Sequence, residues 1–243
     1  MSNPYEQIAN PYAPRTIAYE SELRMGLSAY IARVYLWMAV GLLATALMAF
    51  AAVSTPALRE IIFGSRGVFI GLLIAEFIVV IILSRAALNM PAWLGGLSFL
   101  GYSLLNGATL GVVFLVYTKS SIAGAFVITA GMFGSMALYG LTTKRDLNSW
   151  ASFLFMGLIG IVIASVVNIF MGSAMMHWII SIAGVIVFTG LAAYDNQKIK
   201  EMYEVNAGNE LTRRMSILGA LTLYLDFINL FLFILRLMGS RRN

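Results

Sequence analysis

Cysteine is absent from all 243 residues of the chain. Disulfide bonds, thiolate metal sites and cysteine nucleophiles are therefore excluded. Charge is also scarce, because only 11% of the residues are Asp, Glu, Lys or Arg, against about 25% in an ordinary soluble domain. The basic residues are scattered along the chain instead of gathered in one soluble segment. The net charge of +5 therefore does not indicate a nucleic-acid partner.

What the chain has in abundance is apolar residues, which make up 60% of it. They form seven runs, each close to the length of about 20 residues that a helix needs to cross a bilayer. A membrane β-barrel would show alternating polarity instead, whereas the run VFIGLLIAEFIVVIILS is apolar on every side. The sequence thus predicts an all-α, seven-transmembrane-helix bundle in the lipid bilayer, with spans at 31–53, 68–84, 93–117, 121–142, 150–171, 177–195 and 217–238.

Polar segments flank this membrane domain. The first 30 residues carry three of the five prolines and two NPY triplets, a composition that predicts a flexible polar tail. We therefore divide the chain into a cytoplasmic tail at 1–30, a transmembrane domain at 31–239 and a short basic tail at 240–243.

Basic residues favour the cytoplasmic side of a membrane protein, and their distribution predicts the orientation. If the N-terminus is cytoplasmic, ten basic residues lie on that side: Arg15, Arg24, Arg33, Arg85, Lys144, Arg145, Lys198, Lys200, Arg213 and Arg214. Six lie on the other: Arg59, Arg66, Lys119, Arg236, Arg241 and Arg242. The excess favours a cytoplasmic N-terminus. A last segment that enters the membrane without crossing it is the alternative, because it keeps the basic C-terminus inside.

Two charged residues lie within the last apolar run, LYLDFINLFLFILRLMG, which contains Asp226 and Arg236. Ten residues separate them by roughly 15 Å along a helix and about 80° around it, so they cannot pair with each other. Each must face a partner on another helix or water, because an unpaired charge at a helix centre costs about 2.5 to 3.5 kcal/mol on insertion scales. We expect Glu76, in the second span, to pair with Arg236, and Arg85 to reach an aspartate near the cytoplasmic boundary.

Asp226 has a second candidate partner in Asp195, which ends the sixth span in GLAAYDNQKIK. The sixth and seventh spans are consecutive and antiparallel, joined by a predicted loop over 196–216. Two carboxylates that meet in a membrane cannot both ionise cheaply, so we expect them to share a proton. The simpler interpretation remains open at this point. A buried aspartate can serve only as a hydrogen-bonding contact between helices, worth about 0.6 kcal/mol, and Asp195 can be an ordinary boundary residue.

The two aspartate segments, AAYDNQKIK and LYLDFINLFLFILRLMG, resemble the signature of the Bax inhibitor-1 family, also called the transmembrane Bax inhibitor motif family, in its bacterial branch. The segments YLWMAVGLLATAL and LLNGATLGVVFLVYT extend the resemblance over nearly the whole chain. The resemblance implies a bundle with the last helix at its centre, set in the bacterial inner (plasma) membrane.

The resemblance also implies a function, namely a pH-sensitive calcium leak without a cofactor. The pH-sensing pair of the family corresponds to Asp195 and Asp226, its latching basic residue to Arg85, and its acidic residue of the second span to Glu76. Calcium prefers six to eight oxygen ligands, so two carboxylates predict weak, transient binding of calcium ions and protons at Asp195 and Asp226.

Two other functions use the same helices. A non-conducting modulator of a membrane protease or of a stress response needs the same bundle, and the sequence does not separate it from a channel. An intramembrane aspartyl protease also places two aspartates on adjacent helices. Such proteases combine YD with GxGD, however, and here Tyr194 and Asp195 form YD while Asp226 lies in LYLD. We therefore expect no enzymatic activity.

Overall fold

The structure, a computed structural model, describes residues 13–206 and 210–242. Its helices in chain order are α1 (Ala13–Ser54), α2 (Pro56–Phe63), α3 (Arg66–Ala86), α4 (Ala92–Leu110), α5 (Val112–Val116), α6 (Lys119–Thr142), α7 (Asn148–Met171), α8 (Ala174–Asn206) and α9 (Glu210–Met238). Within the described residues, seven helical stretches are long and apolar enough to cross a membrane. The predicted fold class is thereby confirmed.

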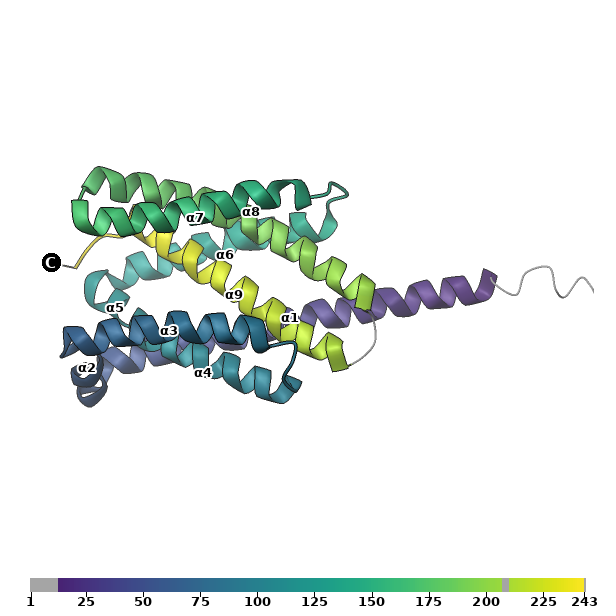
Figure 1. Cartoon of the computed structure of the whole chain (residues 1–243), viewed down its shortest axis with the longest axis horizontal. Coiled ribbons are helices and arrows are strands. Elements are labelled where there is room, and N and C mark those ends of the chain that lie inside the picture. Colours follow the sequence, from purple (N-terminus) through teal and green to yellow (C-terminus); the bar gives the residue numbers. More distant parts are fainter. Residues whose placement is uncertain (1–12, 207–209, 243) are drawn as a thin grey trace, which may run out of the picture.

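The last helix, α9, lies at the centre of the bundle, as predicted. Figure 1 shows it crossing between a group formed by α6, α7 and α8 and a group formed by α1, α3 and α4. Two thirds of its most apolar stretch is buried, against 6% for α3. Ala220, Leu223 and Tyr224 of this helix are fully buried. The sequence of α9 therefore supplies a core face on nearly all sides.

Several helices extend further than their apolar runs. Residues 13–30, predicted to be a flexible tail, belong to α1, while residues 1–12 lie outside the described part of the chain. The predicted loop over 196–216 is also largely helical, because α8 continues to Asn206 and α9 begins at Glu210. These extensions are more polar than the apolar runs, so hydrophobicity alone did not predict them as helix. Tyr30 of α1 and Tyr203 of α8 stack there, with ring centroids 5.2 Å apart, and both rings are buried.

The third predicted span, 93–117, is divided at Gly111 into α4 and α5. A Cβ atom at Gly111 would lie 3.1 Å from Ala52 Cβ and 3.1 Å from the ring of Phe63, so α1 and α2 crowd this position. The short helix α5 then ends at Val116, and Thr118 caps α6 by accepting a hydrogen bond from Ser121 N through its side chain.

The two ends of the bundle are distinct. The start of α1 projects from one end, and the C-terminus lies at the other, together with α2 and α5 (Figure 1). Residues 240–242 attach to the α5–α6 connection, where Thr118 N donates to Ser240 O at 3.1 Å and Arg242 N donates to Val116 O at 2.8 Å. The predicted basic tail is thus held against the bundle as far as Arg242, and α9 runs the full length from one end to the other.

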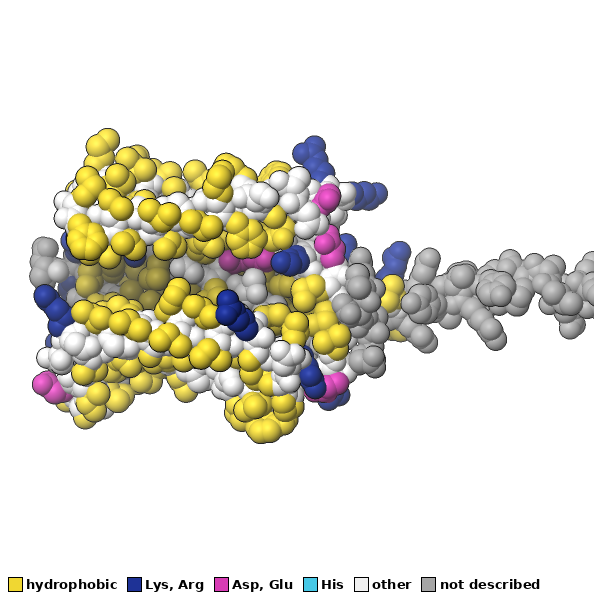
Figure 2. Space-filling view, in the orientation of Figure 1, with side chains coloured by type: hydrophobic (Ala, Val, Ile, Leu, Met, Phe, Trp, Pro, Cys, Tyr) yellow, Lys and Arg dark blue, Asp and Glu magenta, His cyan; other side chains and the backbone are white. Residues whose placement is uncertain are grey.

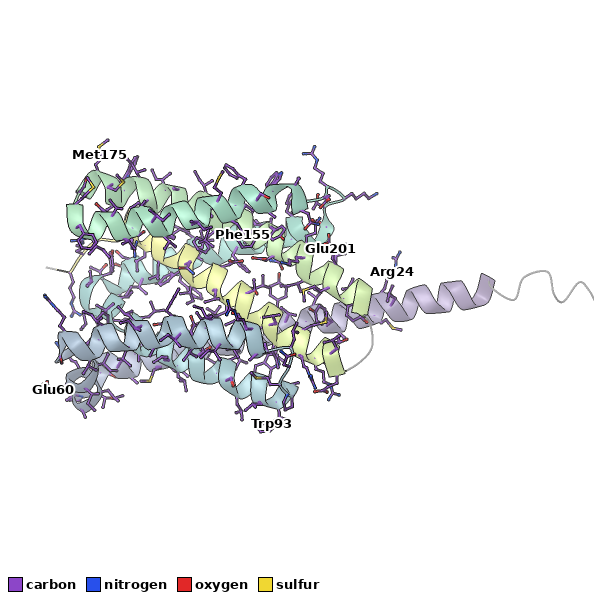
Figure 3. All side chains as sticks on the ribbon, in the orientation of Figure 1. Arg24, Glu60, Trp93, Phe155, Met175 and Glu201 are labelled. Carbon is purple, nitrogen blue, oxygen red and sulfur yellow. The ribbon has the colours of Figure 1, made fainter. Side chains whose placement is uncertain are left out.

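Hydrophobic side chains cover the flanks of the bundle, and charged side chains gather at its two ends (Figure 2). Arg24 and Glu60 mark these opposite ends, and Trp93 and Met175 project outward (Figure 3). Trp93 is 67% exposed and Met175 is 74% exposed. An apolar surface of this extent is what contact with lipid chains requires.

Candidate functional site: a buried carboxyl pair and a polar cavity

Asp195 of α8 and Asp226 of α9 meet inside the bundle. Asp195 is 9% exposed and Asp226 is 5% exposed, and their side chains are within hydrogen-bond distance of each other. The second carboxyl oxygen of Asp226, Oδ2, is buried without a hydrogen-bond partner among the described residues. Because a carboxylate only accepts hydrogen bonds, a bond between two carboxyl groups requires a proton on one of them.

Close packing of α8 against α6 and α9 brings the two carboxyl groups together. Ala192 and Ala193 of α8 are fully buried, and Gly140 of α6 lies so close that a Cβ atom there would be 2.1 Å from Ala193 O. On α9, Gly219 and the fully buried Ala220 face the same core. The small residues next to Asp195 therefore allow the backbone of α8 to approach its neighbours closely.

The two residues after Asp195 fix α8 to other elements. Tyr35 of α1 donates a 2.5 Å hydrogen bond from its hydroxyl to Asn196 Oδ1, and Asn196 Nδ2 donates to Ala192 O. Gln197 Oε1 accepts from Leu147 N, and Gln197 Nε2 donates to Arg145 O, each at 2.8 Å. The sequence DNQ thus connects α8 to α9, to α1 and to the α6–α7 connection in turn.

Cations near the pair are few. Lys198 lies one turn after Asp195 and is the cation whose charge reaches this carboxyl group; its ammonium group is 5.6 Å from the ring centroid of Tyr194. Phe155 of α7, visible in Figure 3, meets the Tyr194 ring edge-on at 6.4 Å. Neither of these contacts of Tyr194 neutralises the charge of an ionised Asp226, which lies roughly midway along α9.

Arg85 was predicted to reach an aspartate, and the structure does not form this latch. Its side chain is exposed at the end of α3 and makes no ion pair with an acidic residue in the described part of the chain. A different arginine ties α9 to the α3–α4 connection. Arg214 Nη1 donates to Leu88 O at 3.1 Å, and Arg214 Nε lies 3.8 Å from Glu210 Oε1.

Glu76 of α3 has different partners from the one predicted. Its carboxyl oxygens accept hydrogen bonds from Asn106 Nδ2 and, at 2.8 Å, from Thr109 Oγ1, both on α4. Arg236 instead stacks on Phe233, with 5.4 Å between the guanidinium carbon and the ring centroid. The predicted ion pair between Glu76 and Arg236 is therefore not formed among the described residues.

Glu76 and Arg236 nevertheless line one cavity of about 410 Å³ between α3, α4, α5 and α9. Its polar lining consists of Glu76, Tyr102, Asn106, Thr109, Tyr117, Asn229 and Arg236. Leu225 and Asn229, which flank Asp226 on α9, also line it. The cavity thus extends from the C-terminal end of the bundle toward the level of the carboxyl pair.

A preformed multidentate metal site is absent from the described residues, because no three His, Asp or Glu side chains come together there. The carboxyl pair offers two acidic ligands, fewer than a tight calcium site uses. Weak calcium binding at Asp195 and Asp226 therefore stays a prediction.

Sequence reasoning identified the two aspartates but missed the polar residues that hold them. Tyr35, Asn196 and Gln197 were not singled out, and neither were Asn106 and Thr109. The signal was present in every case, since a polar side chain inside an apolar span must find a hydrogen-bond partner. Which helix supplies that partner depends on the rotation of each helix about its axis, and one sequence does not define this rotation.

Comparison with known proteins shows which family this chain matches. The family model described as "Inhibitor of apoptosis-promoting Bax1" matches residues 27–243. The inner membrane protein YbhL of Escherichia coli is 52% identical over 221 residues, which cover 90% of this chain and 94% of that protein. A protein of Borreliella burgdorferi is 43% identical over 215 residues, covering 88% of this chain and 93% of its own length.

Proposed function

The chain belongs to the Bax inhibitor-1 family, and from this premise we propose that it is a pH-sensitive calcium leak of the inner membrane, gated by a proton on Asp195 and Asp226. The observation that supports the proposal is the pair itself. Two carboxyl groups lie within hydrogen-bond distance of each other in the core of an apolar bundle. Ionisable residues inside a membrane mark ion or proton pathways more often than they serve as structural contacts.

In the closed state, one shared proton joins α8 to the central helix α9. The hydrogen bond between the carboxyl groups then adds to the packing of α8 against α9, and Asn196 and Gln197 keep α8 in register with α1 and the α6–α7 connection. Residues around the pair are large and buried, among them Phe227 and Leu223. No ion passes such a packed layer without movement of a helix.

Loss of the shared proton at higher pH opens the path. Two unit charges roughly 4 Å apart repel each other by about 4 kcal/mol at an effective dielectric constant of 20. This repulsion exceeds the roughly 0.6 kcal/mol of an average hydrogen bond between membrane helices. The ionised pair therefore pushes α8 and α9 apart, and its oxygens face the widened path.

Calcium suits such a path, because it is a hard cation that prefers oxygen ligands. Asn229 lies three residues after Asp226, and its amide oxygen lines the cavity at the C-terminal end together with the oxygens of Glu76 and Thr109. Ligands spread along a path favour transit over tight binding. We further propose that the N-terminus is cytoplasmic, because the end of the bundle at which α1 begins carries the greater number of basic residues.

The non-conducting alternative, a modulator of another membrane protein, has one observation in its favour. Helix α1 begins at Ala13 and projects well beyond the other helices (Figure 1). A projecting helix offers a surface to a partner such as a membrane protease. It does not account for a carboxyl pair buried away from that surface.

A flux experiment tests the proposal. The purified protein is reconstituted in liposomes, and calcium entry is measured at about pH 6 and about pH 8. We expect faster entry at the higher pH, and a lost pH response in Asp195→Asn and Asp226→Asn. Asp146→Asn is the matched control, because Asp146 is exposed and an amide oxygen can still accept from Asn148 N.

Absence of protein-dependent flux at both pH values contradicts the leak and favours the modulator. If calcium flux in Asp195→Asn and Asp226→Asn responds to pH as it does in the parent chain, the protein conducts calcium but the carboxyl pair is not its pH sensor.

A further inference from the structure

The cavity between α3 and α9 carries opposite charges that do not meet. Glu76 lies ten residues into α3, roughly 15 Å from the start of that helix, and Arg236 lies roughly 3 Å from the end of α9. Both of these helix ends are at the C-terminal end of the bundle (Figure 1). Both residues line the same cavity, and they form no ion pair with each other in the described part of the chain.

The side chains of Glu76 and Arg236 lean in opposite directions along the bundle. Side chains on a helix tilt toward its N-terminus, so Glu76 leans toward the C-terminal end of the bundle while Arg236 on the antiparallel α9 leans inward. The stacking of Arg236 on Phe233, three residues before it, agrees with this direction. One zwitterionic group that enters this cavity can therefore contact both charged side chains.

The inner wall of the cavity is rich in hydrogen-bond acceptors. Both oxygens of Glu76 accept hydrogen bonds, one from Asn106 and one from Thr109. Asn106 is 6% exposed, and its Oδ1 has no hydrogen-bond partner among the described residues. Asn229 donates through Nδ2 to Leu225 O, which leaves its Oδ1 as a further acceptor. A ligand that carries several N–H donors would satisfy this wall.

The cavity is open toward the lipid. Helix α3 packs on α2 and α4 and scarcely touches α9, although α3 and α9 form opposite walls of the cavity. Figure 2 shows a hollow on this face, bordered by hydrophobic side chains. On α3, Ile70, Ile74 and Phe77 are about half exposed or more beside it. Hydrocarbon chains can lie along this border while a polar group enters between the helices.

We propose that this cavity binds the headgroup of a phospholipid that carries a primary ammonium, with the ammonium on Glu76, the phosphodiester on Arg236 and the acyl chains along α3. The ammonium offers three donors to Glu76 and the neighbouring amide oxygens. The phosphodiester supplies the anion that Arg236 lacks. A simple cation at Glu76 leaves Arg236 without an anion, and an anionic headgroup without an amine leaves the acidic inner wall without a donor.

The test uses short-chain lipids that dissolve as monomers, titrated onto the purified full chain in detergent. Dihexanoyl phosphatidylethanolamine is compared with the choline and glycerol analogues and with free phosphoethanolamine. Because a hydrogen bond to a charged group contributes about 1.5 to 3 kcal/mol, we expect the ethanolamine lipid to bind at least about tenfold more tightly than either analogue. Free phosphoethanolamine should bind much more weakly than the lipid, because it has no chains to lie along α3.

Variants then assign the site. Glu76→Gln and Arg236→Gln should each weaken binding of the ethanolamine lipid about tenfold, whereas Glu60→Gln, on the exposed face of α2 at the same end, should not change it. Arg236 is exposed, so its variant keeps the test valid if Glu76→Gln unfolds. Equal affinity for the three headgroups, or an affinity unchanged in Glu76→Gln and Arg236→Gln, overturns the proposal. Binding of free phosphoethanolamine as tight as that of the lipid overturns the lipid as the source. None of these outcomes depends on whether the protein conducts calcium.

Discussion

Replacement of Gly140 by alanine should separate α6 from α8 beside the carboxyl pair. A Cβ atom at this position would lie 2.1 Å from the backbone oxygen of Ala193, and an ordinary contact begins at 3.4 Å. The obstacle is backbone, which cannot rotate away as a side chain can. Helices α6 and α8 must therefore move apart by about 1.3 Å, two residues before Asp195.

The expected cost follows from this displacement. Overpacking of a close contact costs about 1 to 3 kcal/mol, while alanine gains up to about 1 kcal/mol over glycine in a helix interior. Gly134 lies on the same helix, and no atom comes within 4 Å of the position that a Cβ atom would take there. Gly134→Ala should therefore gain the higher helix propensity of alanine without a steric clash. The two variants should differ by about 1 to 3 kcal/mol.

Thermal unfolding of both variants in the same detergent measures the difference. A chain of this size shifts its Tm by about 2 to 4 °C per kcal/mol, so Gly140→Ala should melt about 2 to 12 °C below Gly134→Ala. Equal melting temperatures would contradict the close contact between Gly140 and Ala193, because they would mean that α6 and α8 do not approach each other closely there.

Three further predictions concern the polar contacts. Tyr35→Phe leaves Asn196 Oδ1 buried without its donor, so it should lower stability by about 1 to 3 kcal/mol in thermal unfolding; an effect no larger than that of Tyr139→Phe, at a partly exposed site, contradicts this. Gln197→Leu removes both bonds to the α6–α7 connection, so trypsin should cleave faster after Lys144 and Arg145; cleavage at the rate of the parent chain argues against the role of Gln197. Asp226→Asn removes the repulsion between two ionised carboxylates, so its Tm should exceed that of the parent chain by more at about pH 8 than at about pH 6; a difference independent of pH is inconsistent with a shared proton.

The sequence predicts the membrane fold well, because span length and hydrophobicity are properties of single segments. It fails where a helix continues beyond its apolar run. Tyr30 and Tyr203 lie in stretches too polar to be predicted as spans, yet their rings stack in the core. The energy of this contact comes from two helices far apart in the chain, and neither segment alone reveals it.

In the candidate site, too, some contacts could be predicted from the sequence and others could not. Asp195 and Asp226 were predicted to meet because they lie on consecutive antiparallel helices, and the structure brings their carboxyl groups within hydrogen-bond distance. The partner of Glu76 was chosen by charge and approximate depth. It turned out to be the α4 face with Asn106 and Thr109, because neutral amide and hydroxyl groups satisfy a carboxylate without the desolvation of a second charge.

In the proposed function, a proton shared by Asp195 and Asp226 closes a calcium path. The most direct test measures two quantities on one reconstituted sample at a series of pH values. They are the rate of calcium entry and the infrared absorption of the protonated carboxyl group. We expect the carboxyl absorption to disappear over the same pH range in which calcium entry rises, and Asp226→Asn to abolish both changes. Calcium entry that rises at a pH where the carboxyl absorption is unchanged, or that rises equally in Asp226→Asn, would contradict the proposed function.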